Sequence, residues 1–70
     1  MALDKKTLEL IAVGASVAVC CEPCLEYHCK AAREAGATPA EICHAIKMAE
    51  KVRQAPIDKI KKKCEELNYN

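Results

Sequence analysis

Two cysteines and one histidine are spaced so that they can act together. The stretch Cys21-Glu22-Pro23-Cys24-Leu25-Glu26-Tyr27-His28 holds a Cys-x-x-Cys pair with a histidine four residues later. Pro23 suits the first turn of a helix, where its missing N–H leaves no hydrogen bond unmade. Cys24 and His28 then lie one turn apart on one helix face, and Cys21 is close enough to form a disulfide with Cys24. The positive end of the helix dipole favours thiolate over thiol here, so the motif predicts a redox or nucleophilic site.

A carboxylate inside an apolar segment is the second candidate for chemistry. Glu9 lies between Leu8 and Leu10. Glu9 is either a surface carboxylate near a helix start or a buried carboxylate. A buried carboxylate needs a hydrogen-bond partner, and His28 is the obvious candidate. Twelve helical residues span ~18 Å, so Glu9 and Cys21 would lie far apart on one straight helix. We therefore expect Glu9 to orient His28 rather than to contact a thiol.

The composition predicts one small domain that associates with copies of itself. The chain has 70 residues, of which 51% are apolar. A chain of this size buries only about 60% of its unfolded surface, so it has more apolar surface than one small core can use. The net charge of +1 gives no case for a nucleic acid or a membrane as a partner. A solvated helix face explains the basic run at residues 59–63.

Six cysteines in 70 residues favour a secreted, disulfide-stapled fold, but the many helix-forming Ala, Leu, Glu and Lys residues argue against such a loop-rich scaffold. The N-terminal lysines and the apolar run after them resemble a lipoprotein signal. However, Asp4 and Glu9 place acids in it, and Val19 is a poor residue before Cys20. The apolar run is also too short to span a bilayer. We expect a cytoplasmic protein with mostly reduced cysteines.

Start and stop signals divide the chain into four expected helices. Asp4 can cap a first helix at about 5–19, and a second helix at about 23–35 ends at Gly36, a left-handed cap. The stretch Thr38-Pro39-Ala40-Glu41 is a strong start for a third helix, because it has a capping residue, a proline at the first position and a glutamate at the third. Pro56 breaks the pattern, and a fourth helix follows it. Because no strand-like alternation is present, the fold class is all-α.

Helical projection predicts which side chains face the core. On the second helix, Cys24 and His28 share a face with three alanines, so both should point inward. On the third helix, His44 lies opposite the apolar face and should be exposed. That apolar face consists of Ile42, Ala45, Ile46, Ala49 and Val52.

The other cysteines are assigned mainly structural positions. Cys64 belongs to a narrow apolar seam on the fourth helix and is predicted to be a small core residue. Cys43 lies at the edge of the third helix's apolar face, and the positions of Cys20 and Cys29 are ambiguous. The seam consists of Ile57, Ile60, Cys64 and Leu67.

The segment 4–52 resembles the carboxymuconolactone decarboxylase family and, more narrowly, its alkylhydroperoxidase AhpD branch. The matching segments are Leu8-Glu9-Leu10-Ile11-Ala12, the stretch from Cys21 to His28, and Ala35-Gly36-Ala37-Thr38. A cysteine pair with its histidine, preceded by a glutamate twelve residues before the first cysteine, is a specific combination.

The resemblance implies an all-helical subunit that assembles into homo-trimers or homo-hexamers. It also implies thiol peroxidase or disulfide reductase chemistry, with a glutamate–histidine–cysteine proton relay. By position, Glu9, Cys21, Cys24 and His28 are the residues that carry it. The substrate would be a hydroperoxide or a disulfide, and no bound cofactor is expected because a thioredoxin-like or lipoyl-type dithiol would supply the electrons. One departure is Pro23, where the AhpD branch has a histidine.

Three other functions stay open. A structural zinc site could use the cysteine pair and His28 with a fourth ligand from Cys20, Cys43 or elsewhere, although a second cleanly spaced ligand pair is missing. A thiol-independent enzyme like carboxymuconolactone decarboxylase could use Glu9 and His28 alone. A purely structural oligomer module would need no chemistry. Metal analysis separates the first of these, and thiol alkylation separates the other two.

Overall fold

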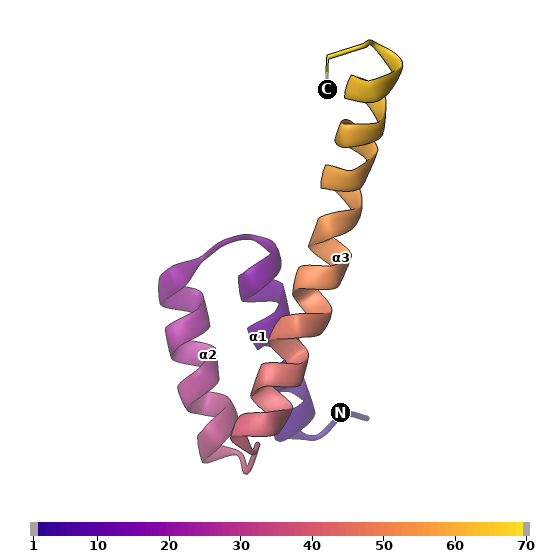
Figure 1. Cartoon of the computed structure of the whole chain (residues 1–70). Coiled ribbons are helices and arrows are strands. Elements are labelled where there is room, and N and C mark those ends of the chain that lie inside the picture. Colours follow the sequence, from indigo (N-terminus) through magenta and orange to yellow (C-terminus); the bar gives the residue numbers. More distant parts are fainter. Residues whose placement is uncertain (1, 70) are drawn as a thin grey trace.

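The computed structural model describes residues 2–69, which form three α-helices joined by short turns (Figure 1). α1 spans Lys5–Ala18, α2 spans Glu22–Glu34 and α3 spans Pro39–Glu66. These residues contain no strand, which confirms the all-α class, whereas the expected number of four helices is wrong. None of the three helices is both long enough and apolar enough to cross a bilayer.

The first and third helices begin at the predicted capping side chains. The Asp4 carboxylate accepts a hydrogen bond from the backbone N–H of Thr7 at 2.8 Å, and the Thr38 hydroxyl accepts one from the N–H of Glu41 at 3.1 Å. The Glu41 carboxylate in turn accepts the N–H of Thr38 at 2.9 Å. The hydrogen bonds from Thr7 lower the pKa of Asp4, and those from Thr38 and then Lys6 lower the pKa of Glu41. Both predicted helix starts are confirmed.

α1 is the central helix of the fold. It forms a hairpin with α2 and also packs along α3, while α2 and α3 touch each other little (Figure 1). The buried core contains Val13 of α1, Ala32 of α2, Ala37 of the next turn and Ile42 of α3. Gly36 has a φ of +100°, which confirms the predicted left-handed cap and lets the chain reverse into α3.

α3 continues through Pro56, so the expected break at this proline and the separate fourth helix are wrong. Proline removes the hydrogen bond to the carbonyl of Val52, four residues earlier. Residues 50–63 are all exposed, so water can satisfy that carbonyl. The Gln54 side chain also donates to Oδ1 of Asp58 at 3.2 Å, which links the turns on either side of the proline. Because water can replace the missing hydrogen bond, α3 continues through Pro56.

The C-terminal half of α3 projects beyond the hairpin (Figure 1). The molecule measures 50 × 25 × 21 Å and has a radius of gyration of 15.5 Å, against about 11 Å for a compact chain of this length. Cys64 is half-buried near the far end of this projection and lies outside the buried core. The prediction that Cys64 is a core residue is wrong, because no other described helix reaches it.

Candidate active site

The two cysteines of the Cys-x-x-Cys motif form a disulfide at the start of α2, with their Cα atoms 5.2 Å apart. Cys21 is the N-terminal cap of the helix, and its sulfur accepts a hydrogen bond from the backbone N–H of Cys24 at 3.2 Å. Pro23 lies in the first turn, as its missing N–H predicts. The predicted pairing is confirmed, and the helix start holds both sulfurs in place.

Cys24 is exposed, so the prediction that it points into the core is wrong. Burial increases along α2: Cys24 is exposed, His28 is half-buried and Ala32 is fully buried. The first turn of α2 lies at the connected end of the hairpin, where α1 is ending (Figure 1). The half of the disulfide that Cys24 contributes is therefore open to a partner from solution.

Glu9 on α1 and His28 on α2 share a short hydrogen bond. Oε2 of Glu9 lies 2.7 Å from Nδ1 of His28, and the two side chains are 18% and 31% exposed respectively. The interpretation of Glu9 as a carboxylate that needs a histidine partner is thus confirmed. The bond explains how an apolar helix tolerates a largely buried carboxylate.

This bond decides which nitrogen of the imidazole is free. A carboxylate can only accept, so in the neutral ring Nδ1 carries the hydrogen and Nε2 is the basic nitrogen. Cys24 precedes His28 by four residues on α2, a spacing that puts Cβ atoms ≈5–6 Å apart. The four predicted site residues therefore form two bonded pairs, Cys21–Cys24 and Glu9–His28. One member of each pair, Cys24 and His28, lies on α2. Their four-residue spacing puts the imidazole one helical turn from the Cys24 side chain.

Tyr27 is a neighbour of the site to which the sequence assigned no role. Its ring lies edge-on to the His28 ring, with centroids 5.0 Å apart and planes at 88°. Tyr27 and Glu9 also border a hollow of about 170 Å³ between α1 and α2. Adjacent residues on a helix do not normally face each other, so spacing gave no signal for this contact. The other residues of the hollow are Lys5, Ala31, Glu34 and Ala35.

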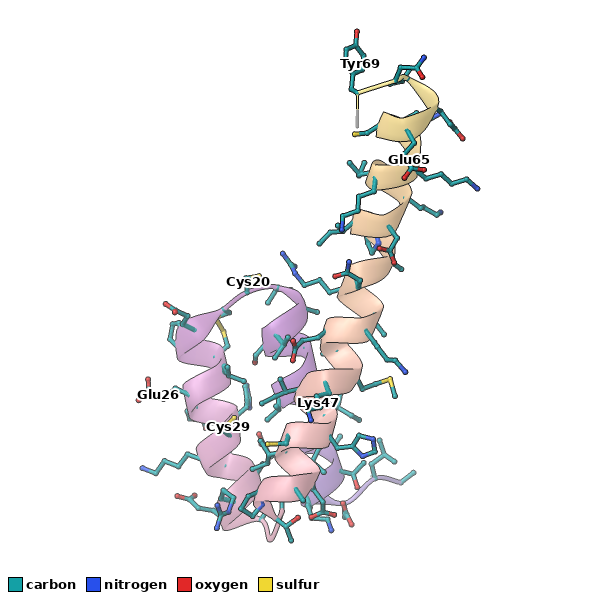
Figure 2. The ribbon with its side chains drawn as sticks, in the orientation of Figure 1. Cys20, Glu26, Cys29, Lys47, Glu65 and Tyr69 are labelled. Atoms are coloured by element: carbon teal, nitrogen blue, oxygen red, sulfur yellow. A yellow bond between two sulfur atoms is a disulfide. The ribbon has the colours of Figure 1, made fainter. Side chains whose placement is uncertain are left out.

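The remaining thiols and the second histidine are scattered. His44 is exposed on α3, as predicted, and Cys43 is exposed beside it. Cys29 is half-buried against the core. Cys20 is exposed at the turn between α1 and α2 (Figure 2), with a φ of 55°. Within residues 2–69, no three or more His, Cys, Asp or Glu side chains are grouped so that they could hold a metal ion.

Fold and site together define a small all-α protein with a cysteine pair beside a carboxylate–imidazole pair. The sequence model of the carboxymuconolactone decarboxylase family matches residues 1–56, and the chain belongs to this family. It is 46% identical over 52 residues to "Uncharacterized protein 4 in cox locus" of Paracoccus denitrificans. That match covers 74% of this chain but 47% of the relative, so the chain spans about half the relative's length. No solved structure gives a significant match.

Proposed function

We propose that the chain is a thiol peroxidase or disulfide reductase of the AhpD type that works through Cys21 and Cys24. One observation carries the proposal: the Glu9–His28 hydrogen bond of 2.7 Å lies one helical turn from the disulfide-bonded pair. A thiol becomes a nucleophile when a base removes its proton, and a base works best when a third group orients it. Membership of a family that includes enzymes supports a catalytic role.

In the reduced protein, Nε2 of His28 takes the proton of the Cys24 thiol. Glu9, which accepts the hydrogen on Nδ1, stabilises the imidazolium that forms. The Cys24 thiolate attacks the terminal oxygen of a hydroperoxide. An S–O bond forms, the O–O bond breaks, and the departing alkoxide takes the proton from the imidazolium. Cys24 becomes a sulfenic acid and the hydroperoxide becomes an alcohol.

Cys21 closes the cycle because its sulfur is held beside that of Cys24. The Cys21 thiol condenses with the sulfenic acid, so that an S–S bond forms and water leaves. Two electrons have then passed from the cysteine pair to the peroxide. An external dithiol restores both thiols by thiol–disulfide exchange. A disulfide substrate would be attacked at sulfur by the same thiolate.

Intact mass after alkylation tests the proposal. The chain has six cysteines, so the reduced protein should take up six alkyl groups. After one equivalent of hydroperoxide it should take up two fewer, and a small dithiol should restore them. A Cys64→Ser variant is the matched control, because it should start with one thiol fewer and lose the same two. Unchanged alkylation of the wild type after hydroperoxide would contradict the proposal.

A further inference from the structure

The projecting half of α3 carries most of the positive charge of the chain. Residues 51–63 contain six basic residues and one acidic residue, a net charge of +5, whereas residues 1–50 have five basic and seven acidic residues, a net charge of −2. Every side chain from 51 to 63 is exposed. The basic residues are Lys51, Arg53, Lys59, Lys61, Lys62 and Lys63. This segment therefore attracts negatively charged surfaces while the body of the molecule does not.

An uncovered apolar strip runs through this basic segment. Ile57 and Ile60 are 43% and 65% exposed. Ile60 follows Ala49 by eleven residues, and Ala49 follows Ile42 by seven, so all three lie near one face of the helix. Ile42 and Ala49 are buried. The face that packs in the core thus continues past the end of the hairpin, where no other described helix covers it.

Arg53 places the basic segment next to the disulfide end of the hairpin. Its Nη1 donates to the carbonyl oxygen of Ala18, the last residue of α1, at 2.6 Å. A helix rises 1.5 Å per residue, so residues 59–63 lie about 9–15 Å beyond this level. A domain of 100 residues has a radius of gyration of about 13 Å. Such a protein can touch this helix and still bring its own thiols to the exposed Cys24.

Charge around the site is divided between two helices. Glu22 and Glu26 are exposed on α2, and Figure 2 shows Glu26 directed away from α3. Glu22 and Glu26 repel an acidic surface and the basic residues of α3 attract it, which favours its approach from the side of α3. Two copies of the basic segment facing each other would place lysines against lysines, which disfavours pairing of this helix with itself.

We propose that residues 51–63 dock the protein that reduces the Cys21–Cys24 disulfide, and that this protein presents an acidic surface with apolar residues. The proposal rests on the proposed function, which requires an external dithiol. The partner's first thiolate attacks the exposed Cys24 sulfur, the S–S bond breaks, and Cys21 leaves as a thiolate that takes up a proton. Its sulfur already accepts a backbone N–H at the positive end of α2, which stabilises that leaving group.

The second thiolate of the partner then attacks the mixed disulfide and releases the Cys24 thiol. The partner is left with a disulfide, and two electrons and two protons have passed to the cysteine pair. The chemistry needs only a dithiol, so a small dithiol also serves. Only a protein reductant would dock on α3, so a change in this segment should alter the rate with a protein reductant but not the rate with a small dithiol.

The experiment measures the rate at which the Cys21–Cys24 disulfide is reduced by a thioredoxin of negative net charge and, separately, by dithiothreitol. The test variant is Lys59→Glu/Lys61→Glu, whose lysines flank Ile60. The control variant, Arg33→Glu/Lys47→Glu, has the same net charge but is changed outside residues 51–63, and Arg33 lies in the last turn of α2, away from the disulfide. At low salt the test variant should react with the thioredoxin about tenfold more slowly than the wild type. The control should stay within about twofold, and dithiothreitol should reduce all three proteins equally.

A salt series on the unmodified protein gives the same test without relying on a variant's folding. The wild-type rate with the thioredoxin should fall as salt rises. Equal thioredoxin rates for all three proteins, or a wild-type rate that ignores salt, would overturn the docking proposal while leaving the proposed function standing. A change in sedimentation on charge reversal would also overturn it, because a second copy would then cover this face. Failure of dithiothreitol to restore two thiols would refute the proposed function instead.

Discussion

Oε2 of Glu9 lies 2.7 Å from Nδ1 of His28, although the two residues are nineteen positions apart and stand on different helices. The bond puts the carboxylate on the far side of the imidazole from Nε2. A negative charge in that position can stabilise the positive charge that develops on the ring as His28 takes a proton from Cys24. The pair therefore links the α1–α2 packing to the reactivity of the thiol.

Replacing Glu9 by Gln should slow the reaction of the reduced protein with hydroperoxide at pH 7 by about ten- to a hundredfold. Gln keeps the shape of the side chain and can still accept the Nδ1 hydrogen, but it lacks the charge that stabilises the imidazolium. The Cys21–Cys24 disulfide should still form, because neither sulfur depends on Glu9. Stopped-flow measurement of thiol loss gives the rate.

Glu34→Gln is the matched control for that variant. Glu34 borders the same hollow as Glu9 but is exposed and belongs to the last turns of α2. The control should react as fast as the wild type. If Glu9→Gln also reacts as fast as the wild type, Glu9 has only a structural role.

Mild oxidation should convert Cys21 and Cys24 into the main disulfide and leave Cys64 alkylatable. Cys21 and Cys24 are already paired, whereas Cys64 lies near the far end of α3. In a Cys21→Ser variant the sulfenic acid on Cys24 loses the thiol that is paired with it in the structure, so dimedone should trap more of it than in the wild type. Peptide mapping by mass spectrometry reads both results. Cys64 in the main disulfide would contradict the assignment.

Local signals in the sequence were enough to predict the helix starts and one half of the site. Caps such as Asp4 and Thr38 act over three residues, so their hydrogen bonds follow from the sequence alone. Glu9 was paired with His28 because a carboxylate inside an apolar helix needs a partner, and the hairpin supplies it.

Features that depend on which neighbour covers a residue could not be predicted in this way. Cys24 and Ala32 share a helix face, yet α1 covers only the second of them. Pro56 would end a helix whose freed carbonyl was buried, but on an exposed projection the helix continues. Cys64 has the spacing of a core residue and no helix to pack against. In each case the periodicity gives the face of the helix on which a side chain lies, but not whether another helix covers that face.

Acid should remove the stabilising effect of Glu41. Its carboxylate accepts the N–H of Thr38 and pairs with Nζ of Lys6 at 3.1 Å, which joins α1 to the start of α3. These contacts lower its pKa from 4.5, so the stability they give is present above about pH 4.5 and is lost as the pH falls through the lower folded-state value. Glu41→Gln should therefore lower Tm at pH 7 and have little effect at pH 2.

Circular dichroism melts at the two pH values check this expectation. Glu50→Gln, at an exposed position in the middle of α3, is the control and should change Tm little at either pH. An equal loss of Tm for Glu41→Gln at pH 7 and pH 2 would mean that its charge contributes nothing.

The residues between the two cysteines should keep the disulfide reducing. Glu22 is an acid in the first turn of α2 and opposes thiolate formation there, and Pro23 offers no proton donor. We expect a reduction potential of roughly −200 to −270 mV, and an upward shift in Glu22→His, because a histidine there would stabilise the thiolate. Glu26→His, one turn further along, should shift it less. A glutathione titration showing a wild-type potential near −120 mV, or a downward shift in Glu22→His, would refute this.

An apolar groove between α1 and α3 should hold a second copy of the chain. The groove has a volume of about 510 Å³. Ile11, Met48 and Val52 line it and are 54%, 54% and 66% exposed. The rest of its lining is mostly small residues, which let another helix approach closely: Thr7, Leu10, Gly14, Ala15, Ala18, Ala45 and Ala49.

We therefore propose that the chain forms a homo-oligomer through this groove; the family resemblance implies a trimer or a hexamer. Ile11→Glu and Met48→Glu each place an unpaired charge in the groove, and burying such a charge against a partner costs more than the apolar contact contributes. Both variants should sediment as monomers at micromolar concentration while the wild type remains associated. Val19→Glu is the control, because Val19 is 72% exposed and does not line the groove. It should leave the oligomer intact. A wild type that sediments as a stable monomer would contradict the proposed oligomer. Dissociation of Val19→Glu would place the interface at the end of α1 instead.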